Sequence, residues 1–448
     1  MSFAPAYAKA AVAQLTDHTD TDCAMFGASS DTSGELIAFE STCDLAGTNL
    51  DGNREIFQID GLGAISQLTD TVDCASANAS SNAAGDVIAF DSDCDFDGGN
   101  VDGSVEIFVF GAAGVEQLTD DQFCSSFVPS INAAGDLVAF DSDCDFVGEN
   151  FERSSEIFQV DVAGVVAQLT DDGSMSGCGS FNASTNAAGN VIAFESDCDL
   201  TGANEDEISE IFRATIGAGS SVTVDQITVS GDDTCGSMLP SSDASGMVVA
   251  FESNCDYTGA NADGGVEIFR ISPSNTLTQV SGSATAECES IMPRVCDDAS
   301  RIVYTSFCDP LGSNADGSFE LFANSLTETV QLTDGDDCTS VAGSMAAGGT
   351  FASFVGDCDL TGGNADGSVE LFQTSVDVCG ACGGPISGNG APERPTASDA
   401  LFILQASVGL DLCPTCSCDV DANDLVAATD ALLVLQAAVG QPVDLDCP

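Results

Sequence analysis

The sequence predicts an all-β protein, a seven-bladed β-propeller with four-stranded blades, followed by a small α-helical C-terminal domain. Three observations predict the propeller. Short motifs recur about every 50 residues, which is typical of a propeller or a similar array. Each period holds about four β-rich runs separated by Gly, Asn and Asp turns. The order of the motifs also requires the two ends of the repeat region to complete one blade together.

Three motifs recur in step, and each predicts one strand of a blade. If the strands are named A to D from the axis outward, Ile-Ala-Phe is strand B, Glu-Ile-Phe is strand C and Gln-Leu-Thr is strand D. Strand B or its variant ends at Phe39, Phe90, Phe140, Phe194, Phe251, Tyr304 and Phe354; strand C begins at Glu55, Glu106, Glu156, Glu210, Glu267, Glu320 and Glu370; strand D begins at Gln14, Gln67, Gln117, Gln168, Gln226, Gln279 and Gln331.

The phase of these motifs predicts how the ring closes. The first Gln-Leu-Thr precedes every Ile-Ala-Phe, and none follows the last Glu-Leu-Phe. Seven complete blades therefore need a strand around Ala11–Leu15 to pair with the strand at Glu370–Ser375, which removes two exposed sheet edges. With its Gly-x-x-Ile-Ala-Phe and Asn-x-Asp-x-x-x-Glu-Ile-Phe strands, the region 11–376 resembles the TolB-type β-propeller repeat. That resemblance implies a fold and hardly any function. Residues 1–10 are predicted to be an N-terminal tail.

Fourteen of the 21 cysteines follow the repeat. The D-to-A and B-to-C connections lie on the same face of a propeller, and each carries one cysteine, always 20 positions apart. This register predicts seven disulfides within blades, each contributing up to roughly 3 kcal/mol through the unfolded state. Cys296 has no repeat partner and either pairs outside its blade or stays buried. The predicted pairs are Cys23 with Cys43, Cys74 with Cys94, Cys124 with Cys144, Cys178 with Cys198, Cys235 with Cys255, Cys288 with Cys308, and Cys338 with Cys358.

The charge balance excludes one class of partner and favours another. With 8 basic and 72 acidic residues the formal net charge is −64, so nucleic-acid binding is excluded by repulsion of phosphate. Divalent cations bound at carboxylate clusters would relieve the self-repulsion, although a salty medium would also screen it. Disulfides point to an oxidising compartment, and we expect an extracellular protein, secreted or at the cell surface. No apolar run is long enough to predict a membrane span.

The acidic turn between strands B and C is a candidate cation site. An Asp after the second blade cysteine, an Asn and a further acid recur there, and oxygen donors of this kind suit calcium. The alternative is local: the Asx side chains hydrogen-bond their own turn, and the Glu that opens strand C caps the backbone of a neighbouring blade. The candidate residues are Asp44, Asn49, Asp51, Asp95, Asn100, Asp102, Asp256, Asn261, Asp263, Asp309, Asn314, Asp316, Asp359, Asn364 and Asp366.

Recognisable catalytic sets are missing. The only histidine, His18, is expected to be a solvated turn residue, the only lysine is Lys9, and no arginine cluster is visible. A carboxylate-dependent hydrolase stays open among so many acids, but the chain has no tryptophan to line a sugar-binding cleft. We therefore predict that the chain is not an enzyme.

The repeat stops after Val376. Residues 377–395 form a Gly/Pro/Cys linker, and residues 396–448 contain two copies of an Asp-Ala-Leu signature at helical spacing that ends on Gly. Before the second copy, oxygen side chains stand at loop positions 1, 3, 5 and 12, with a backbone carbonyl at position 7, as in a calcium loop. These residues are Asp419, Asp421, Asn423, Leu425 and Asp430.

This C-terminal module resembles a dockerin, a paired calcium-loop-and-helix domain that docks onto a partner domain. Glycines and a proline replace the ligands in the first copy, where only Asp399 remains, so we expect one calcium ion. Six cysteines allow fifteen pairings, and sequence does not choose among them. Four of them also have the spacing of a structural zinc site. The six are Cys379, Cys382, Cys413, Cys416, Cys418 and Cys447.

Three functions stay open at this point. The first is an extracellular, calcium-binding structural protein that associates through its C-terminal module, with a head-to-tail contact that would give filaments. The second is a recognition module that binds a protein or glycan on the ring face and is anchored by its tail. The third is the carboxylate-dependent hydrolase.

Overall fold

The computed structural model describes residues 12–19, 22–171, 177–231, 234–283, 287–325, 328–376, 395–407, 418, 420–421, 427–441, 443 and 445. Residues Ala11–Val376 form one compact unit, and the C-terminal helices belong to a second.

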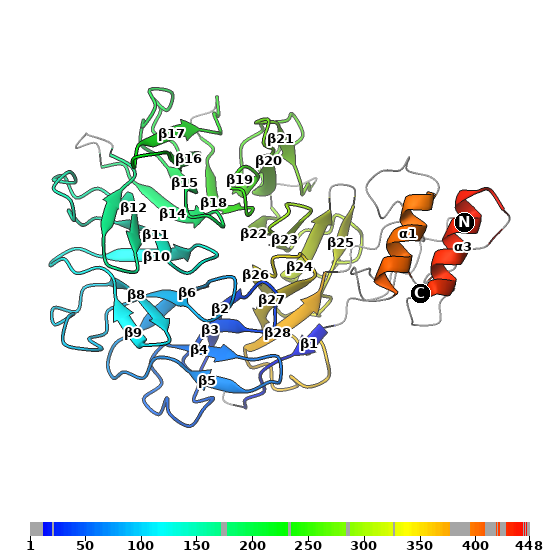
Figure 1. Ribbon diagram of the computed structural model, residues 1–448, viewed down its shortest axis with the longest axis horizontal. Coiled ribbons are helices and arrows are strands. Elements are labelled where there is room, and N and C mark those ends of the chain that lie inside the picture. The colour runs from blue at the N-terminus through cyan, green and yellow to red at the C-terminus, as the bar shows by residue number, and fades with distance from the viewer. Residues whose placement is uncertain are drawn as a thin grey trace. The chain divides into compact units, whose positions relative to one another are not determined.

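The first unit is a ring of seven four-stranded antiparallel sheets, as predicted (Figure 1). From the innermost strand outward the blades are β2 (Met25–Ser30), β3 (Ile37–Ser41), β4 (Glu55–Ile59), β5 (Ile65–Gln67); β6 (Ser76–Ser81), β7 (Ile88–Ser92), β8 (Glu106–Gly111), β9 (Gly114–Gln117); β10 (Ser126–Ile131), β11 (Leu137–Ser142), β12 (Glu156–Asp161), β13 (Val166–Gln168); β14 (Ser180–Thr185), β15 (Val191–Ser196), β16 (Glu210–Ile216), β17 (Val222–Gln226); β18 (Ser237–Ser242), β19 (Val249–Ser253), β20 (Glu267–Ile271), β21 (Leu277–Gln279); β22 (Ser290–Val295), β23 (Arg301–Ser306), β24 (Glu320–Ser325), β25 (Thr329–Gln331); and β26 (Ser340–Met345), β27 (Phe351–Gly356), β28 (Glu370–Ser375), β1 (Val12–Gln14).

The predicted closure of the ring is confirmed. β1 pairs antiparallel with β28, so that the two ends of the propeller unit build the seventh blade together. Val12 lies opposite Thr374 and Gln14 opposite Phe372, and the Leu15 N–H donates to the Leu371 carbonyl at 2.8 Å. The outer edge of β28 is thereby covered by the strand that precedes the first blade.

The two apolar motifs form the core because both faces of strands B and C are buried. In blade two, Phe90 of β7 lies opposite Phe108 of β8, and their rings stack at 5.7 Å between centroids. The alternating residues of blade one, Ala38 and Ile56, pack against these rings across the contact between the blades. A strand that is buried on both faces reads as a continuous apolar run, which explains why Ile-Ala-Phe and Glu-Ile-Phe do not alternate with polar residues.

A ring of hydrogen bonds joins the innermost strands around the axis. In five blades a serine hydroxyl accepts a backbone N–H from the next blade: Ser29 from Ser81, Ser80 from Ile131, Ser130 from Thr185, Ser184 from Ser242 and Ser241 from Val295. Arg294 replaces the serine in blade six, and its Nε donates to the Gly343 carbonyl at 2.7 Å. Ser344 completes the ring by accepting the Ser30 N–H at 3.0 Å.

The glutamate that opens strand C binds its own blade, which corrects the expectation that it caps a neighbour. In blade two, Glu106 accepts the Thr119 hydroxyl and the Asp121 N–H, both in the connection that leaves strand D. Thr119 in turn accepts the Ile107 N–H at 2.9 Å. In blade seven, Glu370 binds the Thr16 hydroxyl and the His18 N–H in the same way. The same contact therefore fixes the end of β1 to β28.

The C-terminal unit contains two helices within its described residues, α1 (Ala397–Ala406) and α3 (Ala428–Ala438). Ala400 and Ile403 of α1 pack with Ala431 and Val434 of α3, and Val420 is buried with them. The helix pair is observed, and its identification as a dockerin-like module stays a prediction. Neither helix in the described part of the chain is long and apolar enough to span a membrane.

We expect Thr16→Val to loosen the closing strand. The substitution leaves the buried Glu370 carboxylate and the Leu371 N–H without the hydroxyl that binds both, at a cost of about 1–3 kcal/mol. Thr119→Val, which removes the same contact within blade two, is the matched control and should lower the thermal midpoint by a similar amount. Hydrogen exchange should rise at the amides of residues 12–15 in Thr16→Val alone. Unchanged exchange there would contradict the role given to this contact.

Candidate functional site

All seven predicted disulfides are present. Each joins the connection before strand A to the connection after strand B, with Cα–Cα distances between 5.0 and 5.3 Å. Seven such bonds fit an oxidising, extracellular environment. The second cysteine of every pair is buried, and these residues are Cys43, Cys94, Cys144, Cys198, Cys255, Cys308 and Cys358.

Cys296 is a buried free thiol, which is one of the two alternatives left open for it. Its sulfur accepts the Arg301 N–H at 3.2 Å and donates to Asp298 at 3.0 Å. The equivalent Asn82 accepts the Val87 N–H in the same hairpin position. Cys296 therefore takes over the turn contact of an asparagine, and burial raises the pKa of its thiol.

The acidic turns on the ring face are held by their own side chains. In blade two, Asp95 Oδ1 accepts the Asn100 N–H at 3.2 Å, and Asn100 Nδ2 donates to the Ser104 carbonyl at 2.8 Å. The same Asp-to-Asn contact joins Asp44 and Asn49, Asp256 and Asn261, Asp309 and Asn314, and Asp359 and Asn364, at 2.9–3.0 Å. The asparagines are buried, and the acid two positions later is exposed at Asp51, Asp102, Asp263, Asp316 and Asp366.

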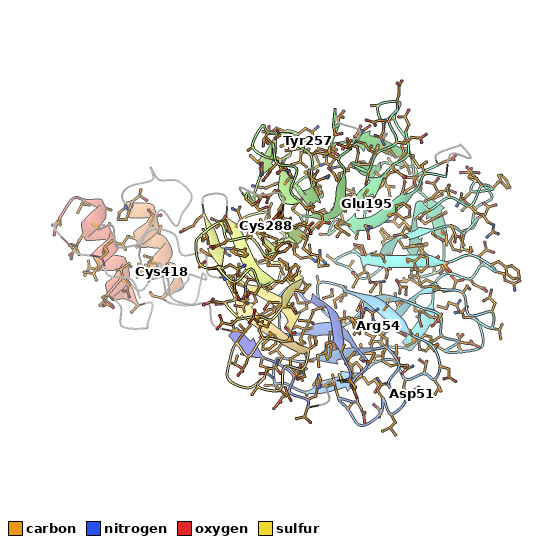
Figure 2. The ribbon with its side chains drawn as sticks, turned by 180° about the vertical axis from the view of Figure 1, so that it is seen from behind. Asp51, Arg54, Glu195, Tyr257, Cys288 and Cys418 are labelled. Carbon is orange, nitrogen blue, oxygen red and sulfur yellow. A yellow bond between two sulfur atoms is a disulfide. The ribbon has the colours of Figure 1, made fainter. Side chains whose placement is uncertain are left out.

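The turns of blades one and five differ from those of blades two, six and seven in what binds the asparagine Oδ1. In blades two, six and seven a serine hydroxyl donates to the asparagine Oδ1, as Ser104 does to Asn100. Asn49 Oδ1 and Asn261 Oδ1 are buried and accept no hydrogen bond among the described residues. A hydrogen bond from the Asp337 N–H lowers the pKa of Asp316, and one from the Ser368 hydroxyl lowers the pKa of Asp366. Figure 2 places Asp51 at the outer rim of the ring.

A second set of acids, which sequence reasoning missed, lies between the blades. The residue after the phenylalanine of strand B accepts a backbone N–H from the inner strand of the next blade. Asp91 accepts from Val128 at 2.9 Å and Asp141 from Asn182 at 3.2 Å. Glu40, Glu195 and Glu252 do the same for Ala79, Leu239 and Met292, whereas blade six uses Thr305. The signal was visible, because five of seven repeats have an acid directly after the phenylalanine.

Burial raises the pKa of these carboxyl groups, because removal from water disfavours the charged form. The pKa of Asp91 rises to about 6 and that of Asp141 to about 7. The pKa values of Glu195 and Glu252 are raised for the same reason. Glu40 is paired with Arg54. Figure 2 shows Glu195 closer to the centre of the ring than Asp51.

The inner strands surround a central cavity of about 470 Å³. Residues from all seven blades line it, among them the serines of the axial hydrogen-bond ring. Glu40 and Arg294 are the charged side chains in its lining. The lining therefore mixes serine hydroxyls with apolar side chains such as Pro129 and Leu239.

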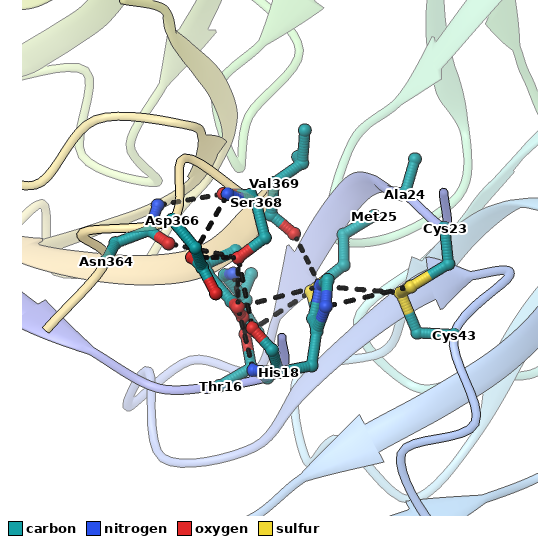
Figure 3. Close-up of polar contacts among 12 residues, drawn as sticks. Thr16, His18, Cys23, Ala24, Met25, Cys43, Asn364, Asp366, Ser368 and Val369 are labelled. Carbon is teal, nitrogen blue, oxygen red and sulfur yellow. Dashed lines mark hydrogen bonds and ion pairs between the residues drawn. A yellow bond between two sulfur atoms is a disulfide. The ribbon is translucent and has the colours of Figure 1, made fainter. Parts of the chain in front are cut away.

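His18 lies against a disulfide at the contact between blades seven and one (Figure 3). Its Nε2 is 3.4 Å from Cys43 Sγ and 3.1 Å from the Val369 carbonyl, and its Nδ1 is 3.7 Å from Cys23 Sγ. Glu370 Oε1 lies 3.5 Å from Nε2. The side chain is 11% exposed, so the expectation of a solvated turn residue is wrong. No other repeat has a histidine at the equivalent position, so the repeat pattern gave no indication of this contact.

Several disulfides have a further potential metal donor nearby. In five groups the two sulfurs of a disulfide and a third side-chain donor lie within 4.8 Å of one another, and the third donors are His18, Asp93, Asp121, Asp197 and Asp357. The Cys235–Cys255 and Cys288–Cys308 disulfides are not among these groups within the described residues. Metal ligation by cysteine requires the thiolate, which a disulfide sulfur does not provide. All fourteen of these cysteines therefore serve as cross-links.

The predicted calcium loop is only partly described. Asp419, Asn423 and Leu425 lie outside the described residues, and Asp421 is exposed. Asp430 is buried and accepts the Val420 and Ala427 N–H groups, each at 2.9 Å. Cys418 is disulfide-bonded. The other five C-terminal cysteines, and with them the zinc alternative, lie outside the described residues.

The two helices present matching exposed leucines. Leu401 and Leu404 of α1 are 56% and 42% exposed, and Leu432 and Leu435 of α3 are 54% and 41% exposed. In both helices these positions follow the buried aspartate, Asp399 or Asp430, by two and five residues. The duplicated signature therefore produces two similar apolar faces.

No protein-family model and no curated protein sequence matches the chain. An oligogalacturonate lyase from Vibrio parahaemolyticus aligns in structure with a TM-score of 0.53 at 14% identity, over 82% of this chain and 93% of that one. A puromycin hydrolase aligns with a TM-score of 0.50 at 12% identity, over 75% of this chain and 50% of that one. TolB from Acinetobacter baumannii aligns with a TM-score of 0.40 at 12% identity, over 81% of this chain and 65% of that one. The first two alignments show a shared fold.

These alignments contradict the prediction that the chain is not an enzyme. Oligogalacturonate lyase structures, one of them in complex with manganese, and a puromycin hydrolase share the propeller fold. The prediction rested on missing Ser/His/Asp and arginine sets, but one fold supports many chemistries, and these sets are only some of those that enzymes use. Their absence is no ground for excluding an enzyme.

We expect the propeller to lose stability as the pH rises from about 4 to about 7. The folded-state pKa of Asp141, about 7, exceeds its ordinary value of 3.8, so the folded state holds this proton more tightly. The resulting stability is complete below pH 3.8 and is lost as the pH rises through the folded-state value. Asp141→Asn keeps an acceptor for Asn182 and removes the buried charge.

This variant should therefore be more stable than the parent protein at pH 8, by at least about 1.4 kcal/mol, which corresponds to one pKa unit. The difference should vanish near pH 4. Thermal unfolding over this pH range measures it. Glu116→Gln removes an exposed charge from β9 and controls for the change in net charge. Equal effects of the two substitutions would show that overall repulsion, and not burial, sets the pH dependence.

Proposed function

We propose that the chain is an extracellular, disulfide-bonded, calcium-binding structural protein that associates with further copies of itself through its C-terminal helix pair. The observation that carries the proposal is the matched set of exposed leucines on α1 and α3. Four large apolar side chains on two short helices form a surface that gains free energy when a partner covers it.

The propeller supports this role by being rigid. Disulfides within every blade and hydrogen bonds between the blades resist opening of the ring. A contact between the helix pair of one copy and the ring of the next is heterologous, and repeated contacts of this kind give open filaments. A net charge of −64 opposes such contacts, and bound calcium would reduce the repulsion.

Calcium fits the donor chemistry of the C-terminal loop. Asp419, Asp421, Asn423 and Asp430 provide oxygen side chains at the spacing of a calcium loop, with the Leu425 carbonyl as a further donor. On the ring face, the turns of blades one and five are the best candidates, because the buried Oδ1 atoms of Asn49 and Asn261 have no described donor. Asp51 and Asp263 supply a carboxylate in the same turns.

Leu401→Asp together with Leu432→Asp should prevent association. Each leucine that is buried in an interface contributes about 1–2 kcal/mol, so the double variant should associate at least roughly tenfold more weakly. Sedimentation velocity and negative-stain microscopy in calcium, with and without chelator, measure the effect. Leu62→Asp, at a 96% exposed leucine of the ring, is the matched control and should behave like the parent protein.

A parent protein that stays monomeric at high concentration in calcium would rule out self-association. The helix pair would then bind a different extracellular protein or anchor a recognition module, and pull-down with the isolated partner would be compared between the double variant and the parent. Equal capture by both would also remove the helix faces from the contact.

Calcium should stabilise the chain through separable sites. A ligand at 100 times its Kd adds about 2.7 kcal/mol to the free energy of unfolding. Isothermal titration should find one site fewer in Asp419→Ala. Asp263→Asn should weaken binding at the ring, whereas Asp102→Asn should not, since the Ser104 hydroxyl already binds Asn100 Oδ1 in that turn. An unchanged number of sites in Asp419→Ala would contradict the calcium loop.

A further inference from the structure

One position of the repeat contacts both a buried glutamate and a disulfide. It lies two residues after the threonine or serine of strand D, and its backbone N–H binds the glutamate of strand C, as His18 does for Glu370 and Thr71 for Glu55. At Thr71 and Asp121 the side chain faces the disulfide of the following blade. Thr71 Oγ1 lies 3.1 Å from Cys94 Sγ, and a Cβ at Gly335 would collide with Cys338 Sγ.

Only the first disulfide receives an imidazole at this position. His18 is the single histidine of the chain, and its two ring nitrogens contact the two sulfurs of Cys23–Cys43. The matched positions hold Thr71, Asp121, Asp172, Ser230, Ser283 and Gly335.

The two cysteines of this disulfide also differ in their exposure to solvent. Cys43 is 2% exposed, whereas Cys23 is half-buried. Cys23 is therefore the residue that a reagent from solvent approaches more easily, which makes Cys43 Sγ the leaving atom. That leaving sulfur is the one 3.4 Å from His18 Nε2 (Figure 3).

We propose that Cys23–Cys43 is a reactive disulfide, a site of thiol exchange at which His18 donates a proton to the leaving sulfur. The thiolate of a small thiol attacks Cys23 Sγ and forms a mixed disulfide. The Cys23–Cys43 bond breaks, and its electron pair goes to Cys43 Sγ. His18 in its doubly protonated form transfers the Nε2 proton, which otherwise faces the Val369 carbonyl at 3.1 Å, to that sulfur. A second thiol then releases Cys23, so that two thiols are oxidised to one disulfide.

The surroundings suit this chemistry better than those of the other six disulfides. Exchange is faster when the leaving thiolate is protonated. An imidazolium is acidic enough to do this, whereas the Thr71 hydroxyl, 3.1 Å from Cys94 Sγ, is not. The chain's net charge of −64 repels a reagent with further negative charge, so the favoured class is a small thiol that is otherwise neutral.

The site also lies where exchange would affect the ring. His18 binds blade seven through its N–H to Glu370, through its carbonyl to the Ser368 hydroxyl and through Nε2 to the Val369 carbonyl. The disulfide that its ring contacts belongs to blade one. Opening this disulfide frees Cys43 and Cys23 beside the contact that holds blade seven against blade one.

The test uses the seven disulfides of one molecule as their own controls. The full chain is treated with limiting dithiothreitol, a neutral dithiol, and quenched with an alkylating reagent at intervals, and peptide mapping gives the reduction rate of each disulfide. Cys23–Cys43 should react about tenfold faster than the other six. This factor is smaller than the roughly hundredfold or more that a positioned proton donor contributes in enzymes. Equal rates for all seven would overturn the proposal.

Two variants assign the difference to the imidazole. His18→Thr installs the residue of blade two and should bring Cys23–Cys43 to the rate of Cys74–Cys94. Thr71→His transfers the imidazole and should accelerate Cys74–Cys94, a gain that a structural role of His18 would not produce. A rate that persists or rises in His18→Thr, or an unchanged Cys74–Cys94 in Thr71→His, would overturn the proposal. The second variant leaves the ring closure intact, so it decides the matter even if His18→Thr does not fold.

Discussion

The hydrogen bonds that join each blade to the next are the constraint on which the rest of the structure depends. A propeller blade buries both faces of its middle strands only when a neighbour lies on each side, and a ring gives every blade two neighbours. Blade seven exists only because β1 returns to β28, where Thr16 binds Glu370. Without that strand, Ser344 and Ser30 would not hold the last contact of the axial ring together. The disulfides strengthen blades that this closure has already positioned.

The same contacts explain how a chain with so many acids folds into an apolar ring. The buried carboxylates of Asp91 and Asp141 accept amide protons at bulges of the next inner strand, where Val128 and Asn182 have positive φ angles of 50° and 54°. A bulge leaves an amide outside the strand ladder, and a buried amide without an acceptor is costly. The acids satisfy these amides, and their raised pKa values record the cost of burying the charge. Seven disulfide-closed loops, each contributing up to roughly 3 kcal/mol, offset part of that cost.

The repeat made the architecture predictable, but it did not predict the contacts of individual residues. Blades, ring closure and all seven disulfides followed from motifs that occur in a fixed order, since a coincidence repeated seven times specifies a register. The acid after Phe90 recurs in five of the seven repeats, but its role depends on which neighbouring amide lacks a partner, and a non-glycine bulge at Val128 has no sequence signature. His18 occurs once, so a repeat-based argument treated it as a loop residue. In the C-terminal loop, Asp430 binds two backbone amides, a role that the spacing of calcium ligands does not reveal.

Several contacts that most blades share are made by different residues in blades six and seven. Arg294 replaces a serine of the axial ring, Cys296 replaces an asparagine or aspartate of the inner hairpin, and Thr305 replaces a carboxylate, all in blade six. Val355 takes the carboxylate position in blade seven, and His18 lies where blade seven meets blade one. Cys296 and Thr305 keep the shared contact with a different acceptor atom, whereas Arg294 replaces a serine acceptor with a donor. These departures lie in blades six and seven and at the contact between blades seven and one. At these positions the role of a residue follows from its own contacts and not from the repeat.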